Sequence, residues 1–401
     1  MDHGVVVVGA GIGGVSVAAA LRSHGYDGQV TLVDAGDFPH DRPPLSKAYL
    51  AGKASAADIA LQPERWYDDH RVNLRCQSRV TALRCEGAVE LDDGTMIAAS
   101  RVVLATGATA ARPTLPGIAD DRIHVLRTVT DADRLAAALV PGARLLIVGA
   151  GLIGAEVAST AIDIGCAVTM VDPTETPLSQ AFGADVADWL HGLATRRGVD
   201  VHAAAVHGFT PSPEGITATI GETSADFDAV LMAVGMRADT ALAAAAGLRL
   251  DRGVVVDDAM VSSNSAILAL GDAASPAGDF VGGRGHWETA RMQADRVAAT
   301  IVGQPVHARA RLSPWFWTDR FGLHVEVVGE MCSGEGIVVR GTFGEPPFAV
   351  FALRGDKLVG AVGVDDNKSV RAAKRIIERN VSVDADALRD TARDLRSLLG
   401  R

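Results

Sequence analysis

Two glycine-rich stretches of this chain have the residue types and spacing of a turn that binds phosphate. The first is "VVVVGAGIGGVSVAAAL" from Val5, and the second is "LLIVGAGLIGAEVASTA" from Leu145. The pattern G-x-G-x-x-G allows a tight turn and brings backbone N–H groups at a helix N-terminus close to a pyrophosphate. The spacing alone is weak evidence, but its duplication after an apolar strand indicates two dinucleotide sites. The positions predicted to contact cofactors are Gly9, Gly11, Gly13 and Gly14, and then Gly149, Gly151, Ile153 and Gly154.

An acidic residue ends the second strand of each copy, where it can accept hydrogen bonds from ribose hydroxyls. "VTLVD" ends at Asp34 and "VTMVD" ends at Asp172. "VDAGDF" leaves Asp37 as an alternative in the first copy, but the repeat aligns Asp34 with Asp172. Glu175 follows in the second copy, and no Lys or Arg occurs from Leu145 to Thr195. A 2′-phosphate would find nothing to neutralise it there, so we predict NADH rather than NADPH at the second site and FAD at the first.

One lysine lies in an unusually stiff stretch, "HDRPPLSKAYL", which runs from His40 to Leu50. Pro43 and Pro44 restrict the backbone dihedral angles, so the side chain of Lys47 is expected to point in a defined direction. The alternative is an ordinary surface lysine.

Two dinucleotide sites in one chain favour chemistry between two cofactors, and the simplest is hydride transfer from a nicotinamide to a flavin.

Further stretches have the pattern of a buried strand that runs into a turn with glycine. "RVVLATGA" begins at Arg101, and "AVLMAVGMRAD" at Ala229 has the same build. "AILALGDAAS" predicts a strand that ends at Asp272, whose carboxylate is placed to accept hydrogen bonds from the ribityl chain of a flavin. The alternative is an ordinary turn aspartate. The cofactor-contacting positions predicted in these turns are Thr106, Gly107, Gly235, Gly271 and Asp272.

The rest of the chain predicts ribbons, helices and a separate C-terminal region. Alternating segments broken by "DDG" and "SPEG", between Leu74 and Val103 and between Val199 and Val230, indicate antiparallel ribbons. Helices are expected from Glu288 to Ile301, from Lys368 to Arg379 and from Asp384 to Leu399. We predict an α/β chain with two Rossmann-like domains and a C-terminal α+β domain. Its predicted parts are an FAD-binding domain in two segments (1–110 and 235–307), an NAD-binding domain (111–234) and a C-terminal domain (308–401).

Bulk composition narrows the possible functions. With 401 residues, 48% of them hydrophobic and 22% charged, the chain has the composition of a globular protein of two or three domains. The net charge of −11 argues against nucleic-acid binding. From Arg284 onward, basic residues outnumber acidic ones, so an acidic partner would meet the C-terminal portion. No run of about 18 apolar residues predicts a membrane span, and we expect a cytoplasmic protein.

The four cysteines, Cys76, Cys85, Cys166 and Cys332, are scattered and form no C-x-x-C pair. This spacing predicts neither a disulfide framework nor a zinc site, and no metal is expected. None of the cysteines is close to Lys47 in the sequence.

Nearly the whole chain resembles the NADH-dependent ferredoxin reductases of bacterial oxygenases, the putidaredoxin-reductase-like family. The stretches that carry the resemblance are "RPPLSKAYLAGK" at Arg42, "LATGA" at Leu104, "VGAGLIGAEVA" at Val148, "LGDAA" at Leu270, "HWETARMQADRVAATIVG" at His286 and "PWFWTDRF" at Pro314. The resemblance implies a glutathione-reductase-like architecture with bound FAD. It also implies that NADH delivers a hydride to the flavin, which then passes single electrons to an acidic 2Fe–2S ferredoxin and so to a Rieske or haem oxygenase.

The resemblance also implies roles for particular side chains. Lys47 would reach the N5 edge of the flavin, and Glu156 would lie beside it and the nicotinamide, as the two catalytic residues. Further cofactor contacts implied are Arg42 and Arg127 at the phosphates or adenine of FAD, Val80 at the adenine and Trp287 near the flavin. No nucleic acid or membrane partner is implied, and the chain would be a monomer or homodimer.

Two features depart from the family pattern. The first acid is followed by a shorter connection to the proline loop, and "TDR" at Thr318 to Arg320 stands where many relatives read Ser-Asp-Gln. The second change could alter partner choice or access to the flavin. The aromatic residues around it, Trp315, Phe316, Trp317 and Phe321, suit a packed core at least as well as an electron-transfer surface. Two alternative functions stay open: a cysteine-independent NADH oxidase, and a flavoprotein that acts mainly in redox-sensitive binding or signalling.

Overall fold

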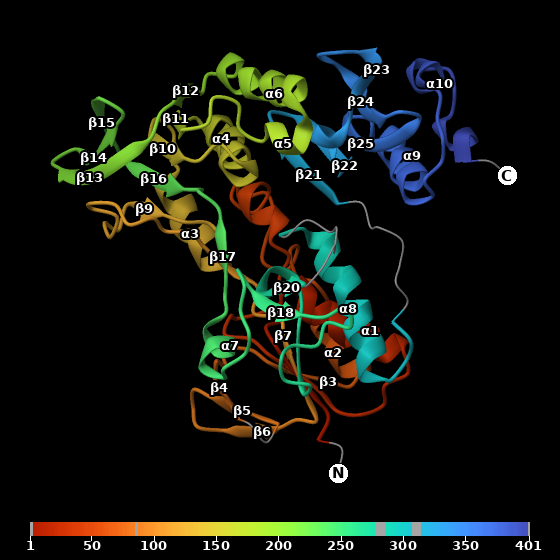
Figure 1. The fold of residues 1–401 in the computed structure, drawn as a ribbon. Helices are drawn as coiled ribbons and strands as arrows, with labels where there is room; N and C mark the ends of the chain where they lie inside the picture. The colour runs from red at the N-terminus through yellow and green to blue at the C-terminus, as the bar shows by residue number, and fades with distance from the viewer. Residues whose placement is uncertain (1–2, 85–86, 277–284, 307–313, 400–401) are drawn as a thin grey trace. The chain divides into compact units, whose positions relative to one another are not determined.

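The computed structural model describes residues 3–84, 87–276, 285–306 and 314–399, and it divides into two units (Figure 1). The first unit comprises Met1–Arg42, Ser55–Thr109 and Met236–Arg311, and the second comprises Pro43–Ala54, Ala110–Gly235 and Leu312–Arg401. The four segments expected from the sequence stay a prediction. The predicted boundary at 307/308 lies outside the described residues, as does Cys85.

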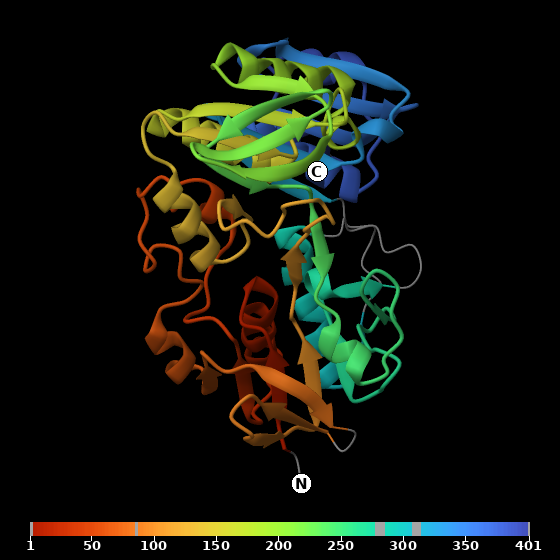
Figure 2. The ribbon, with the colours of Figure 1, turned by 90° about the vertical axis from the view of Figure 1, so that its left-hand side faces the viewer.

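A five-stranded parallel sheet forms the centre of the first unit, in the order β19-β7-β1-β2-β3 (Figure 2). Its strands are β1 (Val5–Val8), β2 (Val30–Val33), β3 (Val72–Arg75), β7 (Arg101–Leu104) and β19 (Ile267–Ala269). All four residues of β1 and of β2 are buried. Both are runs of apolar and β-branched residues, as a strand covered on both faces requires. The order reverses between β1 and β7, and ligands of such sheets bind at that edge.

Helices and shorter strands surround this sheet. The helices are α1 (Ile12–Ser23), α2 (Glu64–Asp69), α7 (Ala241–Ala245) and α8 (Trp287–Ile301), and α1 packs against α8. The short strands are β4 (Val80–Arg84), β5 (Ala88–Leu91) and β6 (Met96–Ala98) in one antiparallel sheet, and β18 (Val254–Val256) beside β20 (Ala274–Pro276). The strand predicted to end at Asp272 ends at Ala269, and Asp272 lies in the short 3₁₀ turn η2 (Gly271–Ala273).

The second unit repeats the same plan, with the parallel order β12-β11-β10-β16-β9. Its strands are β9 (Ile123–His124), β10 (Arg144–Val148), β11 (Ala167–Asp172), β12 (Asp200–Ala203) and β16 (Ala229–Met232). The predicted ribbon is the sheet β13 (Val206–Ser212), β14 (Gly215–Ile220) and β15 (Thr223–Phe227). The helices of this part are α3 (Val129–Ala138), α4 (Leu152–Ile164), α5 (Ser179–Phe182) and α6 (Ala184–Arg196). Strands β8 (Ala108–Ala110) and β17 (Met236–Ala238) stand where the chain passes between units.

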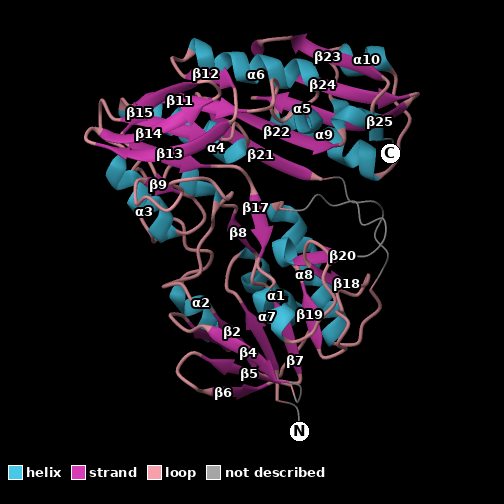
Figure 3. Ribbon diagram, turned by 60° about the vertical axis from the view of Figure 1, so that its left-hand side comes forward, coloured by secondary structure: helices cyan, strands magenta, loops and turns pink. Residues whose placement is uncertain are grey.

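A five-stranded antiparallel sheet, in the order β21-β22-β25-β24-β23, completes the second unit (Figure 3). Its strands are β21 (Trp315–Arg320), β22 (Leu323–Gly329), β23 (Gly336–Thr342), β24 (Glu345–Arg354) and β25 (Lys357–Val364). Helix α9 (Asn367–Glu378) packs on β22 and β25, with η3 (Met331–Ser333) nearby. The predicted fold class, two Rossmann-like domains and a C-terminal α+β domain, is confirmed.

The single helix predicted from Asp384 to Leu399 is wrong. The structure has a short helix α10 (Ala385–Arg389) and a separate 3₁₀ turn η4 (Leu395–Leu399). The Arg340 guanidinium donates hydrogen bonds, at 2.6–3.2 Å, to the carbonyl of Leu388 in α10 and to those of Asp390, Thr391 and Arg393 after it. These carbonyls would otherwise accept bonds within a continuing helix, so an arginine from β23 replaces the missing helical donors.

Candidate active site

The first glycine of each fingerprint has a backbone conformation that favours glycine. Gly9 has φ +102° and Gly149 has φ +106°. A Cβ at Gly9 would lie 2.4 Å from the carbonyl oxygen of Ala105, and one at Gly149 would lie 2.5 Å from that of Ala233. Each turn therefore presses against the end of a neighbouring parallel strand, and any side chain would push the two apart.

The last glycine of each fingerprint allows close packing, and the middle glycine leaves open space. A Cβ at Gly14 or at Gly154 would lie 1.9 Å from the carbonyl oxygen of the first glycine, so only glycine allows the helix to pack this closely. The middle glycine instead borders open space. Gly151 has no described atom within 4 Å of its Cβ position, and Gly11 has only an Arg42 guanidinium nitrogen, at 3.9 Å.

The helix ends beside these glycines are suited to bind phosphate. Gly11 and Gly151 are the N-caps of α1 and α4, and within the described residues neither helix has a side chain that caps its first N–H groups. Free N–H groups at a helix N-terminus attract anions. Together with the open space at the middle glycine, this fits the pyrophosphate of FAD in the first unit and that of NADH in the second.

The two predicted ribose acids are held in the same way. One Asp34 oxygen accepts a hydrogen bond from the backbone N–H of Ala10 at 2.6 Å, and the other accepts one from Gly36 at 2.7 Å. The Asp172 oxygens accept from Ala150 at 2.9 Å and from Thr174 at 2.8 Å. Each carboxylate is thus fixed against its own fingerprint turn, with further lone pairs for ribose hydroxyls. Asp37 instead accepts a bond from the side chain of Gln77, at 2.9 Å.

The remaining predicted FAD contacts in the first unit lie on loops and helix ends. Gly271 has φ +65°, and its N–H donates to the Gln293 side chain at 2.6 Å. A Cβ at Gly13 would contact Leu270 at 3.6 Å, so the turn that carries Asp272 lies beside the first fingerprint. The Trp287 indole N–H donates to Asp41 at 2.9 Å, next to Arg42.

Three other positions stand farther from the fingerprints in the sequence. Thr106 donates through its hydroxyl to the Asp239 carbonyl at 2.7 Å, and Gly107 follows with φ +73°. Val80 begins β4 and is buried. Their contacts with FAD stay a prediction.

In the second unit, predicted residues line the carboxyl ends of β10 and β16. Ile153 is 40% exposed on the first turn of α4, which is unusual for a large apolar side chain. Gly235 has φ +104° and follows Val234, which is 41% exposed. Arg127 immediately precedes the N-cap of α3. The sequence reasoning did not single out Val234, although exposed apolar residues at this edge of a parallel sheet suit a ligand.

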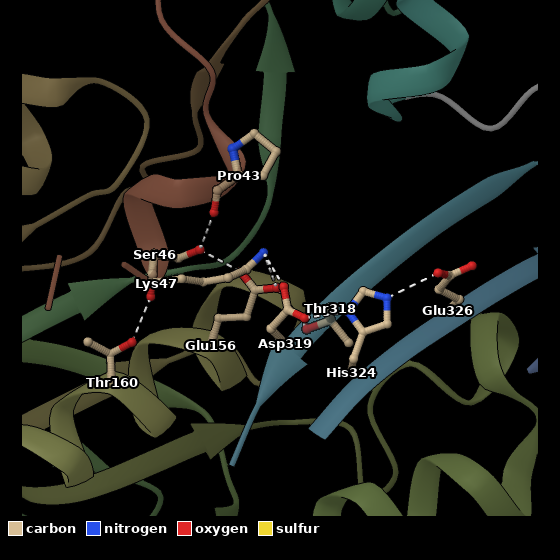
Figure 4. A network of polar contacts seen from close by, with 9 residues as sticks. All are labelled: Pro43, Ser46, Lys47, Glu156, Thr160, Thr318, Asp319, His324 and Glu326. Atoms are coloured by element: carbon tan, nitrogen blue, oxygen red, sulfur yellow. Dashed lines mark hydrogen bonds and ion pairs between the residues drawn. The ribbon is translucent and has the colours of Figure 1, made fainter. Parts of the chain in front are cut away.

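Lys47 and Glu156 form an ion pair, as the resemblance implied. The Lys47 Nζ lies 3.1 Å from Glu156 Oε1, and the Lys47 and Glu156 side chains are 17% and 4% exposed (Figure 4). The proline turn η1 (Pro43–Ser46) ends directly before the lysine. Backbone bonds from Lys47 N–H to Pro44 and from Ala51 to Lys47 hold the turn on both sides, so the lysine is aimed by a rigid segment.

Two hydroxyl groups complete the environment of Glu156. Ser46 donates to Oε2 at 2.5 Å, and Thr318 donates to Oε1 at 2.8 Å. Thr160, one turn further along α4, donates to the Ser46 carbonyl at 2.9 Å. A buried carboxylate is tolerated only when it is paired and hydrogen-bonded, and these donors come from η1 and β21. No sequence motif points to Ser46, because its hydrogen-bond partner Glu156 is 110 residues away in the chain.

Asp319 extends the pair towards the C-terminal sheet, and sequence reasoning assigned it no role. Its Oδ2 lies 3.5 Å from Lys47 Nζ, and its Oδ1 lies 2.5 Å from Nδ1 of His324 on the neighbouring strand. The Lys47 ammonium also lies 5.7 Å from the centre of the Trp317 ring, a cation–π distance. Lys47 therefore faces two carboxylates and an aromatic ring.

The arginine of the "TDR" departure does not lie on the surface. Arg320 is 6% exposed, and its guanidinium carbon lies 5.4 Å from the centre of the Phe182 ring. Its Nε has no hydrogen-bond acceptor among the described residues. Burial lowers the pKa of Arg320 to about 10, although Glu156 acts in the opposite direction. A buried guanidinium cannot select a partner by direct contact.

The aromatic residues around it divide between core and site. Phe321 is buried in the apolar core of the Rossmann part, and Phe316 packs edge-on against Phe182, with ring centres 5.7 Å apart. Trp315 and Trp317 lie with ring centres 5.1 Å apart. Packing accounts for the first two, whereas the ring of Trp317 faces the Lys47 ammonium.

His191 is close enough to Asp172 to feel its charge, but it provides no positive charge for a 2′-phosphate. Burial lowers the pKa of His191, and the charge of Arg320 lowers it further, against the smaller effect of Asp172. The imidazole is therefore neutral at pH 7. This electrostatic arrangement supports the predicted preference for NADH.

The described cysteines are free thiols: Cys76, Cys166 and Cys332. Burial raises the pKa of Cys76 to about 11, and the charges of Asp34 and Asp37 raise it as well. Burial also raises the pKa of Cys166. Because the thiolate is the reactive form, neither residue is prepared for disulfide chemistry at neutral pH.

No helix in the described part of the chain is long and apolar enough to cross a bilayer.

Comparison with known proteins agrees with this geometry. Residues 3–294 match the family model of pyridine nucleotide-disulphide oxidoreductases, and residues 315–399 match that of the reductase C-terminal domain. The chain is 35% identical to the ferredoxin reductase component of chlorobenzene dioxygenase from Cupriavidus sp. (strain PS12), over 98% of this chain and 97% of the relative. It is 34% identical to the putidaredoxin reductase CamA of Pseudomonas putida, over 99% and 97%.

A solved structure agrees with the same assignment. The covalent putidaredoxin reductase–putidaredoxin complex superposes with a TM-score of 0.90 at 33% identity, covering 99% of this chain and 98% of that one. The resemblance inferred from the motifs is confirmed. The chain belongs to the pyridine nucleotide-disulphide oxidoreductase family, among the ferredoxin reductases of oxygenase systems.

Proposed function

We propose that this protein is an NADH-dependent ferredoxin reductase with FAD as its bound cofactor. The observation that carries the proposal is the duplicated fingerprint turn, built with the same backbone contacts in each unit, together with the buried Lys47–Glu156 pair in the second. FAD held by the first fingerprint would supply two-electron acceptance from NADH and one-electron release, which is what an iron–sulfur partner requires. The relatives with this architecture are named as ferredoxin reductase components of dioxygenase systems.

The roles of the chain's own residues follow from their surroundings. The first fingerprint and Asp34 bind FAD, and the second fingerprint and Asp172 bind NADH. Glu156, held by Ser46 and Thr318, fixes the Lys47 ammonium and offers its remaining lone pairs to the nicotinamide carboxamide. A cation fixed in this way stabilises negative charge that develops on a nearby ring system, without having to reorganise.

The partner is an acidic 2Fe–2S ferredoxin that serves a Rieske or haem oxygenase. Helix α9 supports this choice, because it and its C-cap carry several exposed basic residues, Lys368, Arg371, Arg375 and the C-cap Arg379. Complementary charge accelerates association between redox partners. The reductase acts as a monomer or homodimer.

Anaerobic stopped-flow absorbance tests the function. The purified protein is mixed with NADH or with NADPH, flavin bleaching is followed, and an oxidised 2Fe–2S ferredoxin is then added. Fast bleaching by NADH and rapid reoxidation by ferredoxin are expected. Reoxidation by oxygen alone would instead indicate an NADH oxidase. Slow turnover with every ferredoxin, with a long-lived reduced complex and an NADH-dependent change of oligomeric state, would indicate a redox-sensitive binding protein.

A further inference from the structure

His324 on β22 connects two carboxylates in the second unit (Figure 4). Its Nδ1 lies 2.5 Å from Asp319 Oδ1, and its Nε2 lies 3.1 Å from Glu326 Oε1. Asp319 and His324 are directly opposite each other in the antiparallel pair of β21 and β22. The other oxygen of Asp319 lies 3.5 Å from the Lys47 Nζ. One line of contacts thus runs from Glu326 through His324 and Asp319 to the catalytic lysine.

This geometry fits the protonated imidazole. A neutral ring has one N–H donor and could satisfy only one of the two carboxylates, while its other nitrogen would present a lone pair to an anion. The imidazolium has two donors and satisfies both. Burial lowers the pKa of His324, but the hydrogen bonds to Asp319 and Glu326 outweigh burial, so the pKa is raised above its ordinary value.

The other charged groups around His324 leave this balance in place. Its backbone N–H donates to Asp365 Oδ1 at 2.9 Å, from the turn after β25. Glu326 Oε2 accepts the Trp315 indole N–H at 3.1 Å, and the Lys374 ammonium of α9 lies 5.7 Å from the Trp315 ring centre. The two ring nitrogens themselves contact carboxylate oxygens.

We propose that His324 is a positioning residue for the Lys47–Glu156 pair, because its protonated form holds Asp319 and thereby limits how strongly Asp319 competes with Glu156 for the lysine ammonium. The inference deepens the proposed function and rests on it. Protonated His324 shares the Asp319 carboxylate with Lys47. When the imidazole loses its proton, Asp319 retains Lys47 as its cation and draws the ammonium away from Glu156.

The sign of the pH effect follows from this competition. Because the folded-state pKa of His324 is raised, the imidazolium persists above the ordinary value of about 6.5, and its stabilising contacts are lost as the pH rises through the folded pKa. Flavin reduction by NADH should therefore be fastest at low pH and slow by about fivefold across that titration, the lower end of typical coupling between sites.

The first test measures the coupling without any reaction. Histidine side chains of the purified protein are labelled with ¹³C, and the pKa of His324 is determined by NMR, with His324→Gln to assign its resonance. Lys47→Met removes a cation that shares Asp319, so the pKa of His324 should rise by roughly half a unit. Asp319→Asn should lower it. A His324 pKa that Lys47→Met leaves unchanged would refute the coupling.

The second test measures the pH profile of flavin bleaching in stopped-flow experiments. His324→Gln should give a slow, flat profile across the window, and His324→Lys, which keeps a cation there, should give a faster flat profile. His207→Gln is the matched control, because His207 is exposed on β13, and it should keep the wild-type profile. A His324→Gln profile identical to wild type would overturn the proposal. If the protein binds no FAD, the proposed function fails, while the NMR coupling still decides this inference.

Discussion

The buried ion pair of Lys47 and Glu156 is stabilised by additional hydrogen bonds to the carboxylate. The carboxylate has three donors, from Lys47, Ser46 and Thr318, and two of them are uncharged hydroxyls. Removal of the lysine therefore leaves Glu156 with two hydrogen bonds. The carboxylate would then keep its hydroxyl donors but lose its cationic partner, so a lysine variant should lose stability as well as rate.

Lys47→Ala should slow flavin reduction by NADH by roughly tenfold or more, because a positioned charge is lost, and it should leave FAD bound. Stopped-flow bleaching measures the rate, and the ratio of flavin to protein absorbance measures occupancy. Lys53→Ala, at an exposed lysine a few residues further on, is the control and should behave as wild type. Normal reduction by Lys47→Ala would remove the lysine from the mechanism.

Asp172 is the carboxylate that we propose selects NADH over NADPH. Replacing Asp172 by Ser and the exposed Pro173 by Arg should raise the NADPH to NADH ratio of kcat/KM by roughly tenfold or more, because a 2′-phosphate then meets a guanidinium in place of an anion. Asp163→Ser removes an exposed carboxylate from α4 and should leave the ratio unchanged. Steady-state kinetics with both cofactors provide the measurement, and an unchanged ratio in the double variant would show that the nicotinamide site lies elsewhere.

At the scale of elements, the end of the chain depends on one arginine. Arg340 donates to the carbonyl of Leu388 in α10 and to those of three residues between α10 and η4. Arg340→Met should lower the free energy of unfolding by about 2 kcal/mol, since four carbonyls, one of them partly buried, lose a charged donor. Urea unfolding followed by circular dichroism measures this change. Arg371→Met, at an exposed position on α9, should change it by less than about 0.5 kcal/mol, and equal effects of the two variants would contradict the role given to Arg340.

Local patterns were sufficient for some elements and insufficient for others. The strands after Val5 and Leu145 could be predicted because runs of buried apolar residues precede each glycine turn. The break after Arg389 could not, because the donor that replaces the helical bonds is Arg340, about 50 residues earlier in the chain. The burial of Arg320 could not be predicted either, because it depends on the packing of β21 against Phe182.

The candidate site divides in the same way. Lys47, Glu156 and the two ribose acids carry motif signals within a short stretch of sequence. Ser46, Asp319 and His324 have none, because their roles arise from contacts between segments that are distant in the chain. Residue types alone could not reveal a histidine between two carboxylates.

For the whole molecule, the duplicated plan allows each cofactor to be removed separately. A Cβ at Gly14 or Gly154 would meet a carbonyl oxygen at 1.9 Å. Gly14→Ala should therefore give a protein that retains little FAD, whereas Gly154→Ala should keep its FAD and bleach slowly with NADH. Flavin absorbance and NADH titration distinguish the two results.

Gly336→Ala is the matched control, because no described atom lies within 4 Å of its Cβ position and its φ is not positive. It should keep both FAD and the response to NADH. Loss of FAD from Gly154→Ala with retention in Gly14→Ala would reverse the assignment of the two sites.

The carboxylate of Glu156 receives its donors from two stretches that are distant in the sequence, Ser46 and Lys47 early in the chain and Thr318 on β21. Any chimera that exchanged the C-terminal domain between relatives would inherit this requirement. A transplanted domain without a hydroxyl at the position of Thr318 would leave the buried Glu156 carboxylate with one donor fewer, even if its sheet folded correctly. The C-terminal domain therefore contributes directly to the surroundings of the Lys47–Glu156 pair, through Thr318 and Asp319.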